Sequence, residues 1–232
     1  MQIRALASSS RGNCYRITDG QTAILLEAGM PLKRISEGLF FRLRDISASL
    51  VTHEHKDHAK GAAALMDAGI DCWMSLGTAD ALGLSGHRLH IARAGQRFEV
   101  GSWAVMPFAT IHDAREPLGF LLASGREKLL FLTDSAYVPS RFSGITHVMI
   151  EANYQEEILR ENIASGRVSP AQKNRLLMSH MSLENVCRFL EILDTSSLQE
   201  VWLLHASDGN SDAETMVARV SELVNCPVFV AG

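Results

Sequence analysis

Residues that commonly bind metal ions cluster between positions 53 and 58. His53, His55 and His58 occur there with Asp57, directly after the apolar run 46–51. Side chains alternate along a strand end, so His53 and His55 point the same way and can bind one cation. Asp57 and His58 follow where the chain turns into the next helix, and they can reach a second cation beside the first. The spacing therefore predicts a two-metal site.

Three further residues of the same kinds stand later in the chain. His112, Asp134 and His205 each follow an apolar, strand-like run. One such residue alone is most simply a hydrogen-bonded polar residue at a strand edge, but three of them favour a shared site. A His-rich surface turn or a purely structural metal site is the alternative. Structural zinc sites usually include thiolates, and no cysteine lies near this cluster in the sequence.

The composition limits the class of protein. The chain has 232 residues, is 47% hydrophobic and carries a net charge of -4. This composition excludes an intrinsically disordered protein. Lys and Arg number 22 against 26 Asp and Glu, so a protein that coats nucleic acid nonspecifically is excluded. Any contact with nucleic acid must be local. Lys33, Arg34, Arg42 and Arg44 could form a basic strip that follows a nucleic-acid backbone, although helix solvation explains them equally well.

The cysteines and the first residues indicate the compartment. The four cysteines are scattered without a Cys-x-x-Cys pair, which favours buried free thiols. The amino-terminal residues lack a basic segment that leads into an apolar stretch, and no apolar run approaches membrane-spanning length. We therefore expect a cytoplasmic protein with no membrane contact.

Short apolar and alternating runs predict strands and helices along the whole chain. Strands are expected at 3–7, 14–18, 22–26, 46–51, 98–100, 103–110, 119–123, 128–133, 148–151, 201–204 and 227–230. Helices are expected at 31–40, 59–68, 156–164, 171–178, 183–193 and 212–224, with Ser211 or Asp212 as the cap of the last. Two sheets with helices outside them account for this order. Without an internal repeat or linker, a single domain over residues 1–232 is the simplest organisation.

This combination of motifs resembles the metallo-β-lactamase superfamily, through its His-x-His-x-Asp-His cluster and the later His, Asp and His. The resemblance covers essentially the whole chain. It implies an α/β (α+β) fold, a four-layer αβ/βα sandwich of two mixed β-sheets flanked by helices, with a binuclear metal site at one edge. It also implies the ligands, which are His53, His55 and His112 for the first metal, Asp57, His58 and His205 for the second, and Asp134 as the bridge.

Flanking segments are similar to the small, single-domain, nuclease-like branch often called YycJ- or WalJ-like. They are residues 7–15, 112–120, Glu151-Ala152-Asn153-Tyr154 and Ser179-His180-Met181-Ser182. Members of that branch are regarded as DNA exonucleases or phosphodiesterases. The branch normally has aspartate where this chain has Glu27. The resemblance thus predicts that Glu27 contacts the metal-binding histidines through a longer arm.

The resulting hypothesis is a binuclear metal-dependent phosphodiesterase or exonuclease that acts on DNA. A hydroxide held between two divalent ions would attack phosphorus in line. Zinc is the expected metal, with manganese or iron open. The predicted catalytic residues are Asp57, Asp134 and His180. No obligate protein partner is inferred.

Several weaker predictions concern substrate contacts. His180 could contact the scissile phosphate or protonate the leaving oxygen, or it could cap the helix that begins near Ser182. Ser8 and Asn13 belong to a loop that could bind phosphate, or that is a plain turn. Asp113 and Ser182, in the flanking segments, are also expected near the substrate or the metal ligands.

Two other functions fit the same residues. The first is a hydrolase of a small ester, lactone or thioester, since a metal site does not name its substrate. The second is a catalytically silent protein that binds a partner through the same fold.

Overall fold

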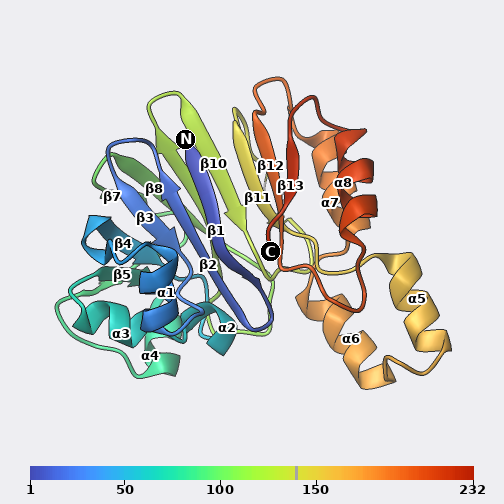
Figure 1. Cartoon of the computed structure of the whole chain (residues 1–232), viewed down its shortest axis with the longest axis horizontal. Coiled ribbons are helices and arrows are strands. Elements are labelled where there is room, and N and C mark those ends of the chain that lie inside the picture. The colour runs from blue at the N-terminus through green and yellow to red at the C-terminus, as the bar shows by residue number, and fades with distance from the viewer. Residues whose placement is uncertain (139–140) are drawn as a thin grey trace. The chain divides into compact units, whose positions relative to one another are not determined.

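The computed structural model describes residues 1–138 and 141–232, which form two compact units (Figure 1). Unit 1 comprises Met1–Ala109, Ala114–Arg126 and Gly232, and unit 2 comprises Thr110–Asp113 and Glu127–Ala231. The single domain over residues 1–232 stays a prediction.

Unit 1 contains a six-stranded mixed sheet with the strand order β1-β2-β3-β4-β5-β6. The first three strands pair antiparallel and the others parallel. The bounds are β1 (Gln2–Ser9), β2 (Gly12–Thr18), β3 (Ala23–Leu26), β4 (Ile46–Leu50), β5 (Asp71–Met74) and β6 (Leu89–Ile91). The turn between β2 and β3 forms because the Asp19 carboxylate accepts the backbone N–H groups of Gln21 and Thr22. The expected antiparallel meander is thus present, while β5 and β6 were not predicted.

The same unit contains an antiparallel group of three strands and several short helices. The strands are β7 (Phe98–Val100), β8 (Trp103–Ala109) and β9 (Leu118–Ser124). The helices are α1 (Leu32–Gly38), a 3-10 turn (Leu43–Asp45), α2 (Lys56–Ala59), α3 (Ala62–Asp67) and α4 (Leu76–Leu82). Helices α1 and α3 bury Ile35 and Leu65 in the core of the six-stranded sheet. That burial supplies the stability that such short helices lack on their own.

The prediction of one continuous helix at 59–68 is wrong, because the chain bends at Gly61 between α2 and α3. The Gly61 N–H donates to the carbonyl of Ala28 at 2.7 Å. A Cβ atom on Gly61 would lie 2.3 Å from the carbonyl oxygen of Met30. The chain therefore bends where the loop after β3 packs against it, which leaves α2 and α3 as separate helices.

Unit 2 contains four parallel strands, β10 (Glu127–Leu132), β11 (His147–Glu151), β12 (Glu200–Leu204) and β13 (Val228–Val230). All five residues of β11 are buried, as expected for a central parallel strand. The helices are α5 (Glu156–Ala164), α6 (Pro170–Ser179), α7 (Leu183–Ile192) and α8 (Ala213–Ser221). Figure 1 shows α8 beside β13 within this unit. The Asp212 side chain accepts the N–H of Thr215, so the predicted cap of the last helix is confirmed.

The strands as a whole make two mixed sheets flanked by helices. All four cysteines are free, and Cys14, Cys72 and Cys187 are buried as expected, whereas Cys226 is only partly buried. Burial raises the pKa of the Cys72 thiol to about 12. Within the described residues, no helix combines the length and apolar character needed to cross a bilayer. The cytoplasmic location stays a prediction.

Gly29 provides a test of the packing around the histidine loop. A Cβ atom at this position would lie 1.7 Å from the carbonyl oxygen of Asp57 and 2.6 Å from the backbone nitrogen of Asn13. We expect Gly29→Ala to lower the free energy of unfolding by about 1–3 kcal/mol, because the backbone must move to admit the methyl group. Urea denaturation measures this change. Gly209→Ala is the matched control, since nothing lies within 4 Å of its Cβ position. Equal stability of the two variants would contradict the close packing.

Candidate metal-binding centre

Three imidazoles gather after β4 in unit 1. Val51, Thr52 and His53 are buried and continue the chain beyond the strand. The ring of His53 lies 4.7 Å from that of His55 and 4.2 Å from that of His58, between centroids. The Thr52 hydroxyl lies 2.9 Å from Nδ1 of His53 and fixes the ring orientation. The cluster predicted from spacing is therefore one local group of rings.

Asp57 and His58 lie in the first turn of α2, and a hydrogen-bonded chain from β1 and β2 supports them. Oδ2 of Asp57 is 3.4 Å from Nε2 of His58. The Asn13 amide donates to the backbone oxygen of Asp57 and lies 3.2 Å from Nε2 of His58. Tyr15 donates its hydroxyl to Oδ1 of Asn13, and the Ser8 hydroxyl lies 2.7 Å from that of Tyr15. Ser8 and Asn13, predicted to contact phosphate, are thus buried supports of the histidine loop.

Glu27 lies at the end of β3 and is fully buried. Its Oε2 accepts the Thr52 N–H at 3.3 Å, and its Oε1 is 3.6 Å from Nδ1 of His58. Burial raises the pKa of Glu27, and His58 and Thr52 only partly oppose this shift. The longer glutamate arm therefore still reaches a histidine of the cluster.

Unit 2 brings together the residues that follow its parallel strands. Asp134 follows β10, His205 follows β12, and Glu151 is the last residue of β11 between them. Nδ1 of His205 is 3.2 Å from Oδ1 of Asp134. His112 reaches the same aspartate, with Nε2 3.5 Å from Oδ2, while its Nδ1 lies 2.8 Å from the carbonyl of Ser179. Neighbouring parallel strands end side by side, which explains the gathering.

The sequence analysis did not select Glu151, although this residue organises the cluster in unit 2. Its Oε2 accepts the backbone N–H groups of Ser135 and Met181. Its Oε1 lies 2.6 Å from Nδ1 of His180 and 3.2 Å from Nδ1 of His205. Burial raises the pKa of this carboxyl, but His180 and His205 outweigh burial and lower it overall. Two signals were available: Glu151 begins one of the family-like segments, and it ends the apolar run Val148 to Ile150.

His180 lies directly after α6 and faces the site of unit 2 rather than a helix end. Its Nδ1 is 3.9 Å from Oδ2 of Asp134 as well as close to Glu151. Burial lowers the pKa of His180, but the charge and hydrogen bond of Glu151 raise it above the ordinary value. The cap of α7 is the Ser182 hydroxyl, which accepts the N–H of Asn185.

Asp113 lies at the edge of the same cluster. Its side chain is half exposed, with Oδ1 3.3 Å from Nε2 of His112 and Oδ2 3.8 Å from Nε of Arg175. It is therefore open to solvent next to a buried imidazole.

The donor groups fit divalent metal ions. In unit 2, Asp134, Glu151, His180 and His205 offer ligand atoms that all lie within 4.8 Å of one another. In unit 1, the loop offers three imidazoles and the Asp57 carboxylate. Imidazole nitrogen and carboxylate oxygen suit zinc, manganese and iron.

Comparisons with known proteins identify the family. A model of the β-lactamase superfamily domain matches residues 24–205. The exodeoxyribonuclease WalJ of Streptococcus pneumoniae is 30% identical over 238 residues, which cover 94% of this chain and 87% of that one. The exodeoxyribonuclease YycJ of Bacillus anthracis is 27% identical over 248 residues, which cover 100% and 92%. This chain belongs to the WalJ/YycJ-like branch of the metallo-β-lactamase superfamily.

A solved structure agrees with the predicted metallo-β-lactamase fold. The metallo-β-lactamase fold protein YhfI from Bacillus subtilis superposes with a TM-score of 0.76 at 13% identity, covering 99% of this chain and 95% of that one. The predicted family and fold class are confirmed, and so is the prediction that the protein is a metal-dependent hydrolase.

Asn13 provides a test of the support beneath His58. We expect Asn13→Ala to lower the free energy of unfolding by about 1–3 kcal/mol, because buried hydrogen-bonding groups lose their partner. Zinc affinity, measured by competition with a chelator, should fall about 10- to 100-fold because the His58 ring loses its orientation. Asn174→Ala, at an exposed position on α6, is the control. An Asn13→Ala protein with unchanged stability and zinc affinity would leave Asn13 only a substrate role.

Glu151 generates a second prediction. In the metal-free protein, Glu151→Gln should lower the pKa of His180, because a neutral amide no longer stabilises the imidazolium. Histidine NMR titration measures the shift. The control is Glu99→Gln, which removes a carboxylate whose side chain is 69% exposed. A pKa that stays at the wild-type value in Glu151→Gln would show that Glu151 does not control this imidazole.

Proposed function

We propose that this protein is a binuclear metal-dependent phosphodiesterase that degrades DNA as an exonuclease. The proposed ligands are the residues inferred from the family resemblance. They are His53, His55 and His112 for one ion, Asp57, His58 and His205 for the other, and Asp134 as the bridge.

The observation that carries the proposal is the convergence of Asp134, Glu151 and His205 at the ends of adjacent strands, joined by His180 from the end of α6. This group combines metal-binding donors with an imidazole that is held by a buried carboxylate. The relatives named as exodeoxyribonucleases support DNA as the substrate, because their similarity extends over nearly the whole chain.

The bound ions would polarise the phosphoryl oxygens and lower the pKa of water. Zinc is the proposed metal on donor chemistry, and it is tested against manganese and iron by metal analysis of the purified protein and by reconstitution.

The protein residues would orient the phosphodiester and manage the protons. Glu151 accepts from the backbone and from two imidazoles, so it fixes both rings before substrate binds. His180 has a raised pKa, so it carries a proton near neutral pH more often than a free histidine. We assign to it the protonation of the leaving oxygen or the binding of the scissile phosphate. Asp57 and Asp134 would act as carboxylates next to the reacting phosphate.

An Asp134→Ala variant tests the hydrolase itself. Wild-type protein with bound metal should degrade labelled DNA and hydrolyse bis(p-nitrophenyl) phosphate. Asp134→Ala should lose nearly all of both activities, because metal binding and charge neutralisation are disrupted together. Acyl-thioesters and lactones are assayed in parallel. Turnover of these esters alone would contradict the proposal. Wild-type protein that takes up no metal on reconstitution and hydrolyses none of these substrates would favour a silent binding protein.

A His180→Gln variant tests the proton donor. We expect DNA cleavage to fall about 10²- to 10⁴-fold in kcat, the usual contribution of general acid catalysis. Hydrolysis of bis(p-nitrophenyl) phosphate should fall much less, because p-nitrophenolate leaves without being protonated. Zinc content, measured in the same preparations, controls for a lost metal. Equal losses on both substrates would instead assign His180 to phosphate or metal binding.

A further inference from the structure

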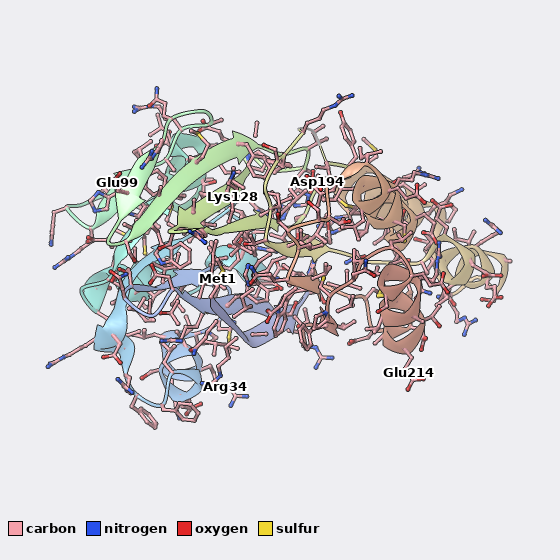
Figure 2. All side chains as sticks on the ribbon, turned by 90° about the horizontal axis from the view of Figure 1, so that it is seen from above. Met1, Arg34, Glu99, Lys128, Asp194 and Glu214 are labelled. Carbon is pink, nitrogen blue, oxygen red and sulfur yellow. The ribbon has the colours of Figure 1, made fainter. Side chains whose placement is uncertain are left out.

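An exposed aromatic and basic surface lies on unit 1, apart from the histidine loop. Phe40 and Phe41 follow α1 and are 70% and 78% exposed. Beside them a hollow of about 140 Å³ is lined by Arg4, Arg16, Leu39, Phe40, Arg42 and Asp45. We call Arg4, Arg16, Phe40, Phe41 and Arg42 the Phe-Arg patch. Figure 2 shows Arg34, on α1 of the same unit, also at the surface.

The backbone holds the two aromatic rings outward. Phe40 and Phe41 have φ values of 53° and 61°, a left-handed conformation that is unfavourable for bulky residues and that usually selects glycine after a helix. Backbone hydrogen bonds fix this turn, from Phe40 to Glu37 and from Phe41 to Ser36. Two large apolar side chains in a strained turn that buries neither of them are better explained by binding than by folding.

The rings differ in what they contact. The Arg4 guanidinium lies over the Phe40 ring, 4.5 Å from its centroid. Phe41 makes no ring contact with any residue in the described ranges 1–138 and 141–232. The Phe41 ring can therefore stack on a planar ligand.

The charges around the rings favour an anion. Arg4 and Arg16 are directly opposite each other on β1 and β2, which places two guanidinium groups together. Arg42 is paired with Asp45 at 2.6 Å, and Asp45 is the only carboxylate among the described residues that line the hollow. The patch is thus locally basic in a chain whose net charge is -4.

From these observations we infer that the Phe-Arg patch binds single-stranded DNA, with a base stacked on Phe41 and phosphates on Arg4 and Arg16. Stacking platforms beside arginines are the usual means of binding single strands, whereas bases in a duplex are already stacked. The inference rests on the proposed nuclease function for its choice of DNA.

Two other occupants fit the patch less well. Helix α1 has seven residues, too few to offer the amphipathic face of a membrane-surface helix. A second copy joined by two-fold symmetry would bring the same arginines together, and like charges repel.

The test measures binding of fluorescein-labelled dT12 with phosphorothioate linkages, which slow its hydrolysis, to the metal-loaded protein. Phe41→Asn removes the ring while asparagine tolerates the left-handed backbone, so the melting temperature should hold or rise. We expect its dT12 affinity to fall about 5- to 150-fold, the loss typical of one stacking residue. Arg16→Gln should reduce the slope of log affinity against log salt by about 0.7. Binding of a 12-base-pair duplex should change little in Phe41→Asn.

Matched controls lie elsewhere on the surface. Ile192→Asn removes an apolar side chain that is 79% exposed, and Arg97→Gln removes a guanidinium that is 60% exposed. Both should bind dT12 as the wild type does. A folded Phe41→Asn protein with wild-type dT12 affinity would overturn the inference. Two other results for Phe41→Asn would also overturn it. One is a loss of binding only to vesicles containing 30% phosphatidylglycerol, and the other is a change of oligomeric state without a change in dT12 binding.

Hydrolysis of bis(p-nitrophenyl) phosphate separates this inference from the proposed function. If the wild type hydrolyses it and every patch variant binds dT12 normally, the patch inference alone fails. If the wild type hydrolyses no phosphodiester yet Phe41→Asn still loses dT12 binding, the nuclease proposal alone fails.

Discussion

Two buried glutamates, one in each unit, impose the constraints on which the two candidate metal-binding clusters depend. Glu27 in unit 1 and Glu151 in unit 2 are both fully shielded from solvent. An ionised carboxylate in such a position costs several kcal/mol unless N–H donors surround it. Glu151 meets this requirement with two backbone N–H groups and two imidazoles. The chain segments that supply them must therefore converge at the end of β11, and this convergence creates the cluster.

Glu27 in unit 1 has fewer hydrogen-bond donors than Glu151, so its charge depends more on the neighbouring His58. Glu27 accepts one backbone N–H, and its other oxygen lies 3.6 Å from His58, beyond good hydrogen-bond distance. Burial consequently raises its pKa, whereas the pKa of Glu151 is lowered. The two carboxylates thus hold their imidazoles by different means. In unit 2 the charge is compensated by several donors, and in unit 1 it depends mainly on one neighbouring ring.

The sequence predicted the elements whose patterns are local. Apolar runs correctly predicted the positions of β4, β10, β11 and β12. A residue that can cap a helix correctly predicted the start of α8. The short strands β5 and β6, of four and three residues, were not predicted. The break at Gly61 depends on a carbonyl distant in sequence, so no local pattern could reveal it. Glu151 was missed for the same reason, since its donors come from separate segments.

The backbone at three strand ends is strained, although each position carries a side chain that can bind metal. Glu27, Asp134 and His205 each follow a buried strand and each has a positive φ, between 44° and 68°. A left-handed residue reverses the chain sharply while its side chain stays at the strand end. Glycine would adopt that conformation without the cost of about 1–3 kcal/mol that such residues incur. Since all three positions carry a carboxylate or an imidazole in place of glycine, the side-chain chemistry outweighs the backbone strain.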